Sequence, residues 1–554
     1  MTMDRVTSFL SDPIHYEDAS APPHICETHA SQVFLTDHFA YKRKKSVKLP
    51  FLDYSSLDLR AQACAAELRV NEAFAPGMYL GLVYLVENAQ AELTWGEAAQ
   101  AQEVLVKMRR YRLEDQLDVR LARGPLQNEE ETALCQHLCA CLGATSQGDL
   151  LPAAYAFMVE EHVLENRRSL EQLATELGLD PDPWRLQTSR LLLYLKTRSR
   201  DFADRVRQGW VRLGHGDLKP EHLILQSPPV LMDAIEFNTS FRTLDLADEL
   251  SFLELELTAE GHGPFGQRMR QRVLSGLGDS PIASLLAFYR IYRAHVRAKV
   301  LLFRAAQLEG GERETVLKQI QWYQRYAQKE LDQLGAAPVF FIVGTMGSGK
   351  STLARALHQC FGGIHLESDA VRRELYGASP QAYAFGAGIY SYEHRERVYR
   401  ELLARTQAIL DAGGIPLVDA SFAEADFWKI FAEVIEQRRC PYRVLLCECS
   451  EALAKARVEQ RRVQGHSLSE ARSELLSQQR RGVSWAFPED RVLRISTEQP
   501  MESILSQCLA AEGLALAEEG ARAPQFLGDS NGPRLCRHSL CTKLDTLDLC
   551  TESR

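Results

Sequence analysis

Apolar residues in the first part of the chain follow two patterns, short runs between turn residues and longer stretches at helical spacing. Strands are predicted where the runs are short, at residues 33–35, 39–42, 79–86 and 104–108. Helices are predicted where helical spacing persists, at residues 57–74, 129–207 and 284–334, with a break at Gly310 and Gly311. With a strand–loop–strand unit at 210–233, these elements predict a mixed α+β domain over residues 25–334.

The pattern changes after residues 335–338, which read Gly-Ala-Ala-Pro. A fully apolar run of strand length follows at 339–343, and further buried strands are predicted at 414–418 and 443–447 with helices between them. Because this alternation is typical of a parallel sheet with helices on both faces, we predict an α/β domain at 338–515. Residues 518–554 are polar and aperiodic, and they are predicted to be disordered.

The composition limits the classes of partner. Of the 554 residues, 45% are hydrophobic and 25% are charged, as in an ordinary globular protein. The net charge is −10 and the pI is about 5.9, so a nucleic-acid partner is not expected, although a local basic patch could hold one phosphate-bearing substrate. No apolar run is long enough to cross a membrane and no secretion signal precedes the first domain, which predicts a cytoplasmic protein. The oligomeric state does not follow from these numbers.

The 13 cysteines are an odd number spread along the chain, which favours free thiols over disulfides. Cys135, Cys139 and Cys141 lie around His137 and could ligate zinc. No second Cys/His pair follows to complete a tetrahedral site, so core or surface thiols are the preferred interpretation.

The most specific motif is the glycine-rich stretch GTMGSGKST at residues 344–352, which matches G-x-x-x-x-G-K-[ST]. An apolar strand precedes it and a helix-compatible stretch follows, which is the context that the motif requires. Backbone N–H groups of such a loop face a phosphate, and the helix N-terminus adds positive potential. Lys350 would bridge the β- and γ-phosphates of ATP, and the Ser351 hydroxyl would hold Mg²⁺. The predicted nucleotide-binding residues are Gly344, Gly347, Ser348, Gly349, Lys350, Ser351 and Thr352.

Two aspartates follow predicted strands of the same domain. Asp369 comes after a short apolar run and could accept the proton of an acceptor hydroxyl, while Asp419 is placed to orient Mg²⁺. A helix N-cap is the structural alternative for each aspartate. Arg372 and Arg373 could grip an anionic group of the acceptor.

A basic stretch near residue 460 is predicted to lie on a helix. Arg457 and Arg461 or Arg462 would neutralise the transferring phosphoryl group as part of a mobile lid. A solvated helix face is the alternative, because charge runs are usually exposed.

The motifs GTMGSGKSTLA, LESDAVRREL, VDASF and ARVEQRR together resemble small P-loop kinases related to gluconate kinase, polynucleotide 5′-kinase and zeta-type toxins. The resemblance covers about residues 337–515 and implies a P-loop kinase or AAA-type ATP-binding domain. It assigns the acceptor contact to Asp369 and the lid arginines to Arg457 and Arg461 or Arg462. The family often has an arginine shortly after D-A-[ST]-F, where this chain has Phe427-Trp428-Lys429.

The stretch HGDLKPEH at residues 215–222 is the most informative part of the N-terminal half. It is followed by Asp233 after a predicted strand, the order in which kinase-like folds place the base and a metal ligand. Asp217 would orient or deprotonate the attacking hydroxyl, and Asp233 would hold Mg²⁺. Upstream, Lys42 would contact phosphate and pair with Glu67. The alternatives are a capped turn at Asp217 and a solvated charge cluster at Lys42.

The segments VFLTDHFAYKRKK, VKMRRY, HGDLKPEHLIL and LMDAIEFN resemble the aminoglycoside phosphotransferase and choline kinase group. The whole arrangement resembles bacterial two-domain proteins that join such a domain to a P-loop kinase. The resemblance implies a two-lobed protein-kinase-like domain in front of the P-loop domain. Two departures stand out: there is no G-x-G-x-x-G, and His222 replaces an asparagine that would ligate a second Mg²⁺. Since imidazole suits Mg²⁺ poorly, a slow or degenerate N-terminal site is predicted.

The prediction is therefore an ATP- and Mg²⁺-dependent kinase whose C-terminal domain phosphorylates a hydroxyl of an unidentified small molecule. The N-terminal domain would be a second phosphotransferase or a degenerate nucleotide-binding domain. The alternatives are a nucleotide-gated regulatory protein and a nucleic-acid 5′-hydroxyl kinase. The four arginines Arg290, Arg293, Arg297 and Arg304 share one predicted helix face, interpreted as a solvated face or an anionic acceptor site.

Overall fold

The computed structural model describes residues 4–27, 30–49, 52–377, 388–464 and 482–510, and it leaves out the side chains of 49, 52 and 461–464. The predicted tail at 518–554 lies outside these residues. Each of two compact units is built from separate parts of the chain: residues 4–151 with 205–322, and residues 152–204 with 323–510. The predicted break at 335–338 therefore lies inside the second unit, and the domain limits 25–334 and 338–515 stay a prediction.

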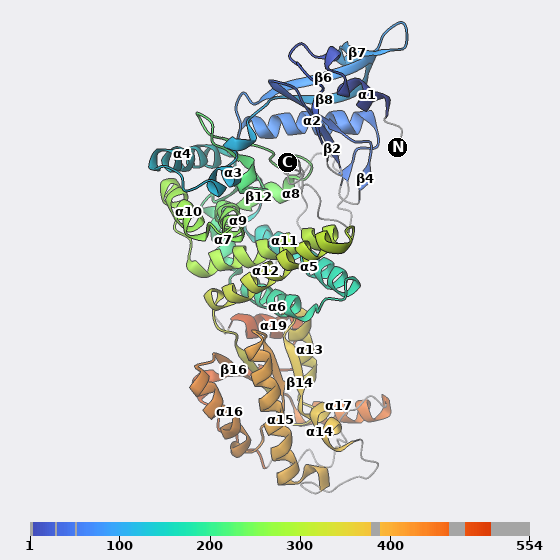
Figure 1. Ribbon diagram of the computed structural model, residues 1–554. Helices are drawn as coiled ribbons and strands as arrows, with labels where there is room; N and C mark the ends of the chain where they lie inside the picture. The colour runs from blue at the N-terminus through green and yellow to red at the C-terminus, as the bar shows by residue number, and fades with distance from the viewer. Residues whose placement is uncertain (1–3, 28–29, 50–51, 378–387, 465–481, 511–554) are drawn as a thin grey trace. The chain divides into compact units, whose positions relative to one another are not determined.

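The first unit contains a six-stranded antiparallel sheet (Figure 1). In sheet order its strands are β1 (His24–Glu27), β2 (Ser31–Leu35), β3 (Phe39–Lys44), β8 (Ala101–Arg109), β6 (Tyr79–Glu87) and β7 (Leu93–Gly96). Helix α2 (Leu57–Glu72) packs on β6 and β8, over a core that includes Ala40, Cys64 and Val106. Because side chains alternate along a strand, Lys42 and Lys44 share the face of Ala40, while Tyr41 and Arg43 point to the other face.

The rest of the first unit is mainly helical. Its principal helices are α3 (Leu117–Ala122), α4 (Asn128–Ala144), α9 (Leu246–Ala259), α10 (Gly263–Leu277) and α11 (Ala283–Ala305). Two short antiparallel pairs form the loops of the site, β9 (Val211–Leu213) with β12 (Thr243–Asp245) and β10 (Leu223–Ile224) with β11 (Val230–Leu231). The antiparallel sheet followed by helices confirms the predicted N-terminal fold class.

The second unit contains a five-stranded parallel sheet. In sheet order its strands are β14 (Ile364–Glu367), β15 (Pro416–Asp419), β13 (Val339–Val343), β16 (Tyr442–Glu448) and β17 (Val492–Ser496). Phe341 faces the aromatic core under α15 (Tyr392–Asp411) and α16 (Ala425–Arg438), whereas Phe340 packs on Phe361 of α13 (Lys350–Phe361). Both faces of β13 are thus buried, which explains its uninterrupted apolar run and confirms the predicted α/β class.

Two helices from the middle of the chain, α5 (Pro152–Glu176) and α6 (Asp182–Thr197), complete the second unit. The Ser189 hydroxyl donates a hydrogen bond to the carbonyl of Gly362, with 2.8 Å between the oxygens. The buried Arg190 guanidinium donates to the carbonyls of Gly413, at 3.2 Å, and Gly335. These contacts hold α6 against the end of α13 and the turn before β15. Within the described ranges, no helix combines the length and apolarity needed to cross a membrane.

Candidate functional sites

The P-loop of the second unit joins β13 to α13 in the predicted way. Gly344 and Gly347 have φ values of 150° and 74°, and a Cβ atom at either would lie 2.6 Å from a backbone carbonyl oxygen. Any other residue would therefore strain the loop or collide with its neighbours. Lys350, Ser351 and Thr352 form the first turn of α13, behind Gly349. The loop can thus present backbone N–H groups to an anion.

The polar groups of this loop are arranged in a way that suits a phosphate ligand. The Lys350 ammonium donates to the carbonyl of Thr345, with 3.0 Å between the two atoms. The Ser348 hydroxyl is buried, and among the described residues it has no hydrogen-bond partner. A buried polar group usually has a partner, so this hydroxyl fits an oxygen ligand of the loop.

Carboxylates gather at the same edge of the sheet, where β14 and β15 end. Glu367 and Asp419 are paired residues of these neighbouring strands. The Ser351 hydroxyl donates to Glu367 over 3.4 Å, and the His365 ring lies 3.1 Å from the Asp419 carboxylate. Burial raises the pKa of Glu367, and the nearby Asp419 and Asp369 raise it further. Hydroxyl and carboxylate oxygens are ligands that Mg²⁺ prefers.

The structure does not support the capping alternatives for the two aspartates. Helix α14 (Ser368–Tyr376) has Glu367 at its N-cap position, and Asp369 forms an ion pair with Arg372 of the same helix. Asp419 precedes α16 by several residues and does not cap it, because Glu424 occupies that position. Both carboxylates are thus held beside the P-loop, and their predicted roles stay predictions.

Arg457 lies on α17 (Glu451–Gln464) and is connected to the P-loop through Thr497. Its guanidinium donates to the hydroxyl and carbonyl oxygens of Thr497 at 2.9 and 2.8 Å, and the Thr497 hydroxyl donates to the carbonyl of Ser348 at 2.7 Å. A cavity of about 640 Å³ beside the loop is lined by Thr345, Cys449 and Trp485, among others. The side chain of Arg461 and the predicted lid around 465–467 lie outside the described residues.

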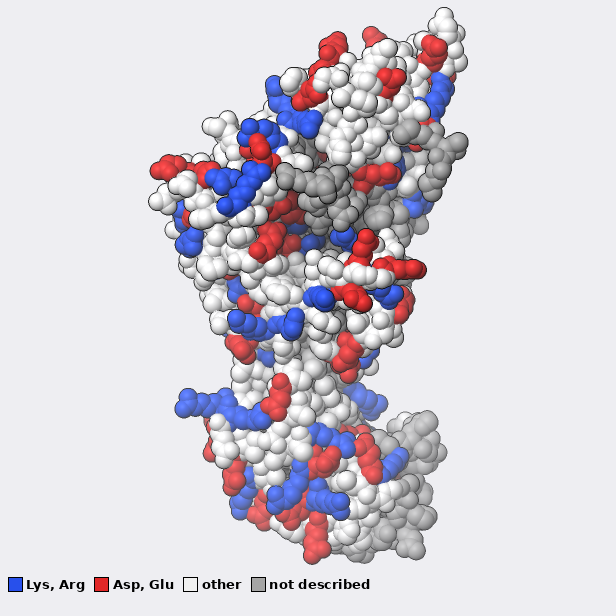
Figure 2. Space-filling model, viewed as in Figure 1, with Lys and Arg blue, Asp and Glu red and all other residues white. Residues whose placement is uncertain are grey.

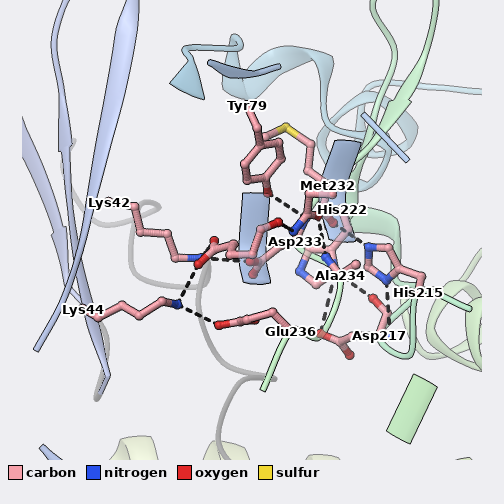
Figure 3. A network of polar contacts seen from close by, with 12 residues as sticks. Lys42, Lys44, Tyr79, His215, Asp217, His222, Met232, Asp233, Ala234 and Glu236 are labelled. Atoms are coloured by element: carbon pink, nitrogen blue, oxygen red, sulfur yellow. Dashed lines mark hydrogen bonds and ion pairs between the residues drawn. The ribbon is translucent and has the colours of Figure 1, made fainter. Parts of the chain in front are cut away.

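In the first unit, Lys42 connects three elements. Its ammonium lies 2.8 Å from Glu67 on α2. It also lies 2.9 Å from Asp233 after β11 (Figure 3). Although burial disfavours its charge, Asp233 and Glu67 hold the pKa of Lys42 above its ordinary value. Asp233 has a φ of 63°, uncommon for a residue other than glycine. The strand, the helix and the loop are therefore fixed around one ammonium group.

A second lysine extends this network. The ammonium of Lys44 lies 2.6 Å from Glu67 and 2.7 Å from Glu236, so Glu67 bridges two lysines. Lys42 is 6% exposed and Lys44 is fully buried, and the interpretation of this run as a solvated cluster is wrong. Lys44 and Glu236 were not among the predicted site residues, although the strand period places Lys44 on the same face as Lys42.

The HGDLKPEH loop is held by a buried glutamate. The Glu249 carboxylate of α9 accepts the backbone N–H groups of His215 and Gly216 at 2.7 and 2.8 Å. Asp217 is 2% exposed, and one of its carboxylate oxygens has no partner within the described part of the chain. Burial raises the pKa of Asp217, and Lys219, 3.6 Å away, opposes that effect. The loop is thus buried and held by hydrogen bonds to Glu249, and it is not a locally capped surface turn.

Three of the four arginines on the predicted face of α11 form neither a solvated face nor an open anionic site. Arg290 and Arg293 are buried, Arg297 is half-buried, and all three pair with acidic side chains of α9. The contacts are Arg290 with Glu254 at 3.4 Å, Arg293 with Asp248 at 2.7 Å, and Arg297 with Glu256 at 2.9 Å. Only the packing of α11 on α9 brings the acidic side chains next to these arginines, so the pairing could not be predicted from the sequence.

A cavity of about 740 Å³ lies between the sheet and these loops of the first unit. Ala40 and Lys42 line it from β3, Met108 from the end of β8, and His222 and Asp233 from the loops. Apolar side chains and charged groups line it together, as in many small-molecule or cofactor sites. Within the described ranges, no three His, Cys, Asp or Glu side chains form a ready-made metal cluster, around Cys135 or elsewhere.

The parallel sheet, the P-loop and the adjoining carboxylates define the second unit as a P-loop kinase-type domain, which implies ATP binding. Residues 339–484 match the family model described as AAA domain. Over 411 residues the chain is 28% identical to an uncharacterized protein of Mycobacterium tuberculosis. This match covers 72% of this chain and 78% of the relative. Over 75 residues it is 37% identical to a shikimate kinase of Actinobacillus pleuropneumoniae, which covers 13% of this chain and 43% of that enzyme.

Solved structures similar to parts of the chain include a gluconokinase from Sinorhizobium meliloti. It is 20% identical, covers 32% of this chain and 91% of its own, and has a TM-score of 0.24. The GDP complex of an aminoglycoside phosphotransferase mutant is 14% identical, covers 59% of this chain and 97% of its own, and has a TM-score of 0.32.

Proposed function

We propose that this chain is an ATP-dependent phosphotransferase whose second unit transfers the γ-phosphoryl group of ATP to a hydroxyl of a small molecule. The observation that carries the proposal is the position of Lys350, Ser351 and three carboxylates at one edge of the parallel sheet. Phosphoryl transfer depends mainly on positioning and electrostatic stabilisation, and these groups supply both. A shikimate kinase among the relatives supports a small-molecule acceptor.

In this proposal the residues of the second unit have separate roles. Lys350 turns from the Thr345 carbonyl to the β- and γ-phosphates, while the P-loop N–H groups hold the phosphate oxygens. Asp369 accepts the proton of the acceptor hydroxyl. Ser351 and Asp419 would hold Mg²⁺, which supplies positive charge beside the phosphoryl group. Arg457 and Arg461 add positive charge from the following helix.

For the first unit we propose nucleotide binding in the 740 Å³ cavity, with Lys42, held by its ion pair with Glu67, at the phosphates and Asp233 at a metal ion. Asp217 is the candidate base of a second phosphotransferase site. Because His222 occupies the position of an amide ligand, a degenerate site that binds nucleotide without transfer is the second candidate.

Two alternatives follow from different uses of the same sites. A nucleotide-gated regulator would bind ATP in the first unit and transfer nothing there. A nucleic-acid 5′-hydroxyl kinase would need a basic surface for its substrate. Figure 2 shows basic and acidic side chains interspersed among the described residues of the displayed face, which favours a small acceptor.

The full chain should be incubated with ATP labelled at the γ-phosphoryl group and with panels of hydroxylated metabolites and 5′-hydroxyl oligonucleotides. Lys350→Ala and Asp217→Asn then assign any transfer to one unit. We expect a labelled small molecule that Lys350→Ala abolishes and Asp217→Asn preserves. Transfer at the wild-type rate by Lys350→Ala would refute the role of the P-loop. ATP binding without transfer to any acceptor would favour the regulator, and labelled oligonucleotides would favour the nucleic-acid kinase.

A further inference from the structure

Only one of the two ring nitrogens of His222 has a hydrogen-bond partner among the described residues. Its Nδ1 atom lies 2.7 Å from the backbone carbonyl oxygen of Asp217. A carbonyl oxygen only accepts hydrogen bonds, so Nδ1 carries a proton, and in the neutral ring Nε2 carries the lone pair. His222 is 1% exposed, and Nε2 is buried without a partner in the described part of the chain. The ring therefore offers an unused nitrogen lone pair.

The neighbouring His215 shows what a structural histidine looks like in the same loop. Its Nε2 donates to the carbonyl of Met232 at 2.8 Å, and its Nδ1 accepts the backbone N–H of Asp217 at 3.3 Å. Both ring nitrogens are thus used, and burial lowers the pKa of His215 to about 3. Because a buried polar atom without a partner costs stability, the free Nε2 of His222 calls for a ligand.

The free nitrogen belongs to a cavity with a carboxylate. His222 and Asp233 both line the 740 Å³ cavity, together with Lys42 and Glu221. A histidine that ligates a metal almost always donates its other ring N–H to a carbonyl or carboxylate, which fixes the tautomer. The bond from Nδ1 to the Asp217 carbonyl has this form. Two protein ligands do not hold an ion tightly alone, but nucleotide phosphates would complete the set.

We propose that the first unit has a mixed nitrogen–oxygen metal site, with His222 Nε2 and Asp233 as ligands, that selects a divalent transition ion over Mg²⁺. The proposal rests on nucleotide binding by this unit. Imidazole nitrogen is a borderline ligand that favours transition ions, whereas Mg²⁺ prefers oxygen. His222 is then the residue that sets the metal preference of the site, and the loss of the amide ligand is an exchange of metal, not a defect.

The test uses Mn²⁺ as a paramagnetic probe on the full chain, with a non-hydrolysable ATP analogue and Lys350→Ala to weaken the P-loop site. Pulsed electron paramagnetic resonance should detect a nitrogen coupled to the bound Mn²⁺. Nitrogen-isotope labelling of histidine should change that coupling. His222→Asn should abolish it, whereas His365→Asn, which alters the histidine beside the P-loop carboxylates, should leave it. Asp233→Asn should release the ion from the first unit.

Metal preference gives an independent readout. Co²⁺ and Mg²⁺ are titrated against bound Mn²⁺, and the concentrations that displace half of it are compared. In His222→Asn the preference for Co²⁺ over Mg²⁺ should fall by about tenfold or more, as expected when the environment of a metal ligand is changed. Turnover of ATP by the first unit with Mg²⁺ should rise in the same variant, and Asp217→Asn should remove that gain.

The outcomes separate this inference from the proposed function. If the first unit binds the nucleotide with Mn²⁺ and wild-type protein shows no coupled histidine nitrogen, the inference is wrong while nucleotide binding stands. A coupling that disappears in His365→Asn and persists in His222→Asn would also overturn it. If no nucleotide binds when Lys350 is replaced, the proposed function of the first unit fails instead. Wild-type labelling keeps the test decisive even if His222→Asn does not fold.

Discussion

Glu249 is a buried carboxylate whose ionisation should make the stability of the first unit depend on pH. It is fully buried on α9 and accepts the backbone N–H groups of His215 and Gly216. Burial raises its pKa from 4.5 to about 7, and Arg293 and the two hydrogen bonds only partly oppose this effect. The perturbation that tests this is Glu249→Gln, which keeps the shape of the side chain and removes its titration.

The sign and size follow from linkage. Between the unfolded pKa near 4.5 and the folded pKa near 7, the folded state binds more protons than the unfolded state, so stability falls as pH rises. Each pKa unit corresponds to about 1.4 kcal/mol, which gives a loss of about 2–3 kcal/mol between roughly pH 5 and pH 8. In Glu249→Gln this pH-dependent contribution to stability is absent, since a glutamine side chain does not titrate in this range.

The assay is urea unfolding at a series of pH values for wild-type protein and Glu249→Gln. The transition of the first unit is the one that a nucleotide analogue raises in a Lys350→Ala background. The free energy of unfolding of wild-type protein minus that of the variant should fall by about 2–3 kcal/mol from pH 5 to pH 8. Glu72→Gln, an exposed change on α2, is the control. A difference curve that is flat or rises with pH would refute the reasoning.

Three further predictions concern the other parts of the molecule. Asp369→Asn should keep ATP affinity, measured by calorimetry, and slow transfer by roughly 10²–10⁴-fold; an effect on stability alone would favour a structural role. Glu67→Gln removes the carboxylate shared by Lys42 and Lys44, so the nucleotide affinity of the first unit should fall by about tenfold, or about 1.4 kcal/mol of binding free energy. The exposed control Glu72→Gln should leave this affinity unchanged. Arg190→Met leaves the carbonyls of Gly335 and Gly413 without this donor and should lower the free energy of unfolding of the second unit by about 1–3 kcal/mol, measured in urea. Arg185→Met, on the exposed side of α6, is the control, and an equal effect of the two changes would contradict the structural role of Arg190.

Much of the fold could be read from the sequence where one local pattern decides the structure. The strand at 339–343 was predicted at its observed limits because both faces of β13 are buried, and its apolar run is unbroken. Strand β1 was not predicted, because it lies at the sheet edge and has exposed ends, half-buried middle residues and no fully buried position. Helical spacing likewise predicted helices at 129–207 but could not show which core α5 and α6 would join.

The candidate sites divide in the same way. Lys42, Asp217, Asp233 and the P-loop residues follow from motifs, in which residue type and spacing are set by one local segment. Glu236, Glu249 and Thr497 act through contacts with segments distant in the sequence, so only the fold reveals them. Lys44 was not predicted because the strand was expected to end at residue 42, whereas β3 continues to Lys44 and so places this side chain on the face of Lys42.

The separate origin of α5 and α6 has a consequence for how the protein is made. Ser189 and Arg190 are translated about 150 residues or more before their partners Gly335, Gly362 and Gly413. A long segment of the first unit lies between them in the sequence. At roughly 5–20 residues per second on the ribosome, that gap lasts on the order of 10–30 s. During that time α5 and α6 have been synthesised but the parallel sheet on which they pack has not. The ribosome is then translating residues 205–322, which complete the first unit. The second unit can therefore fold completely only after the first unit has been synthesised.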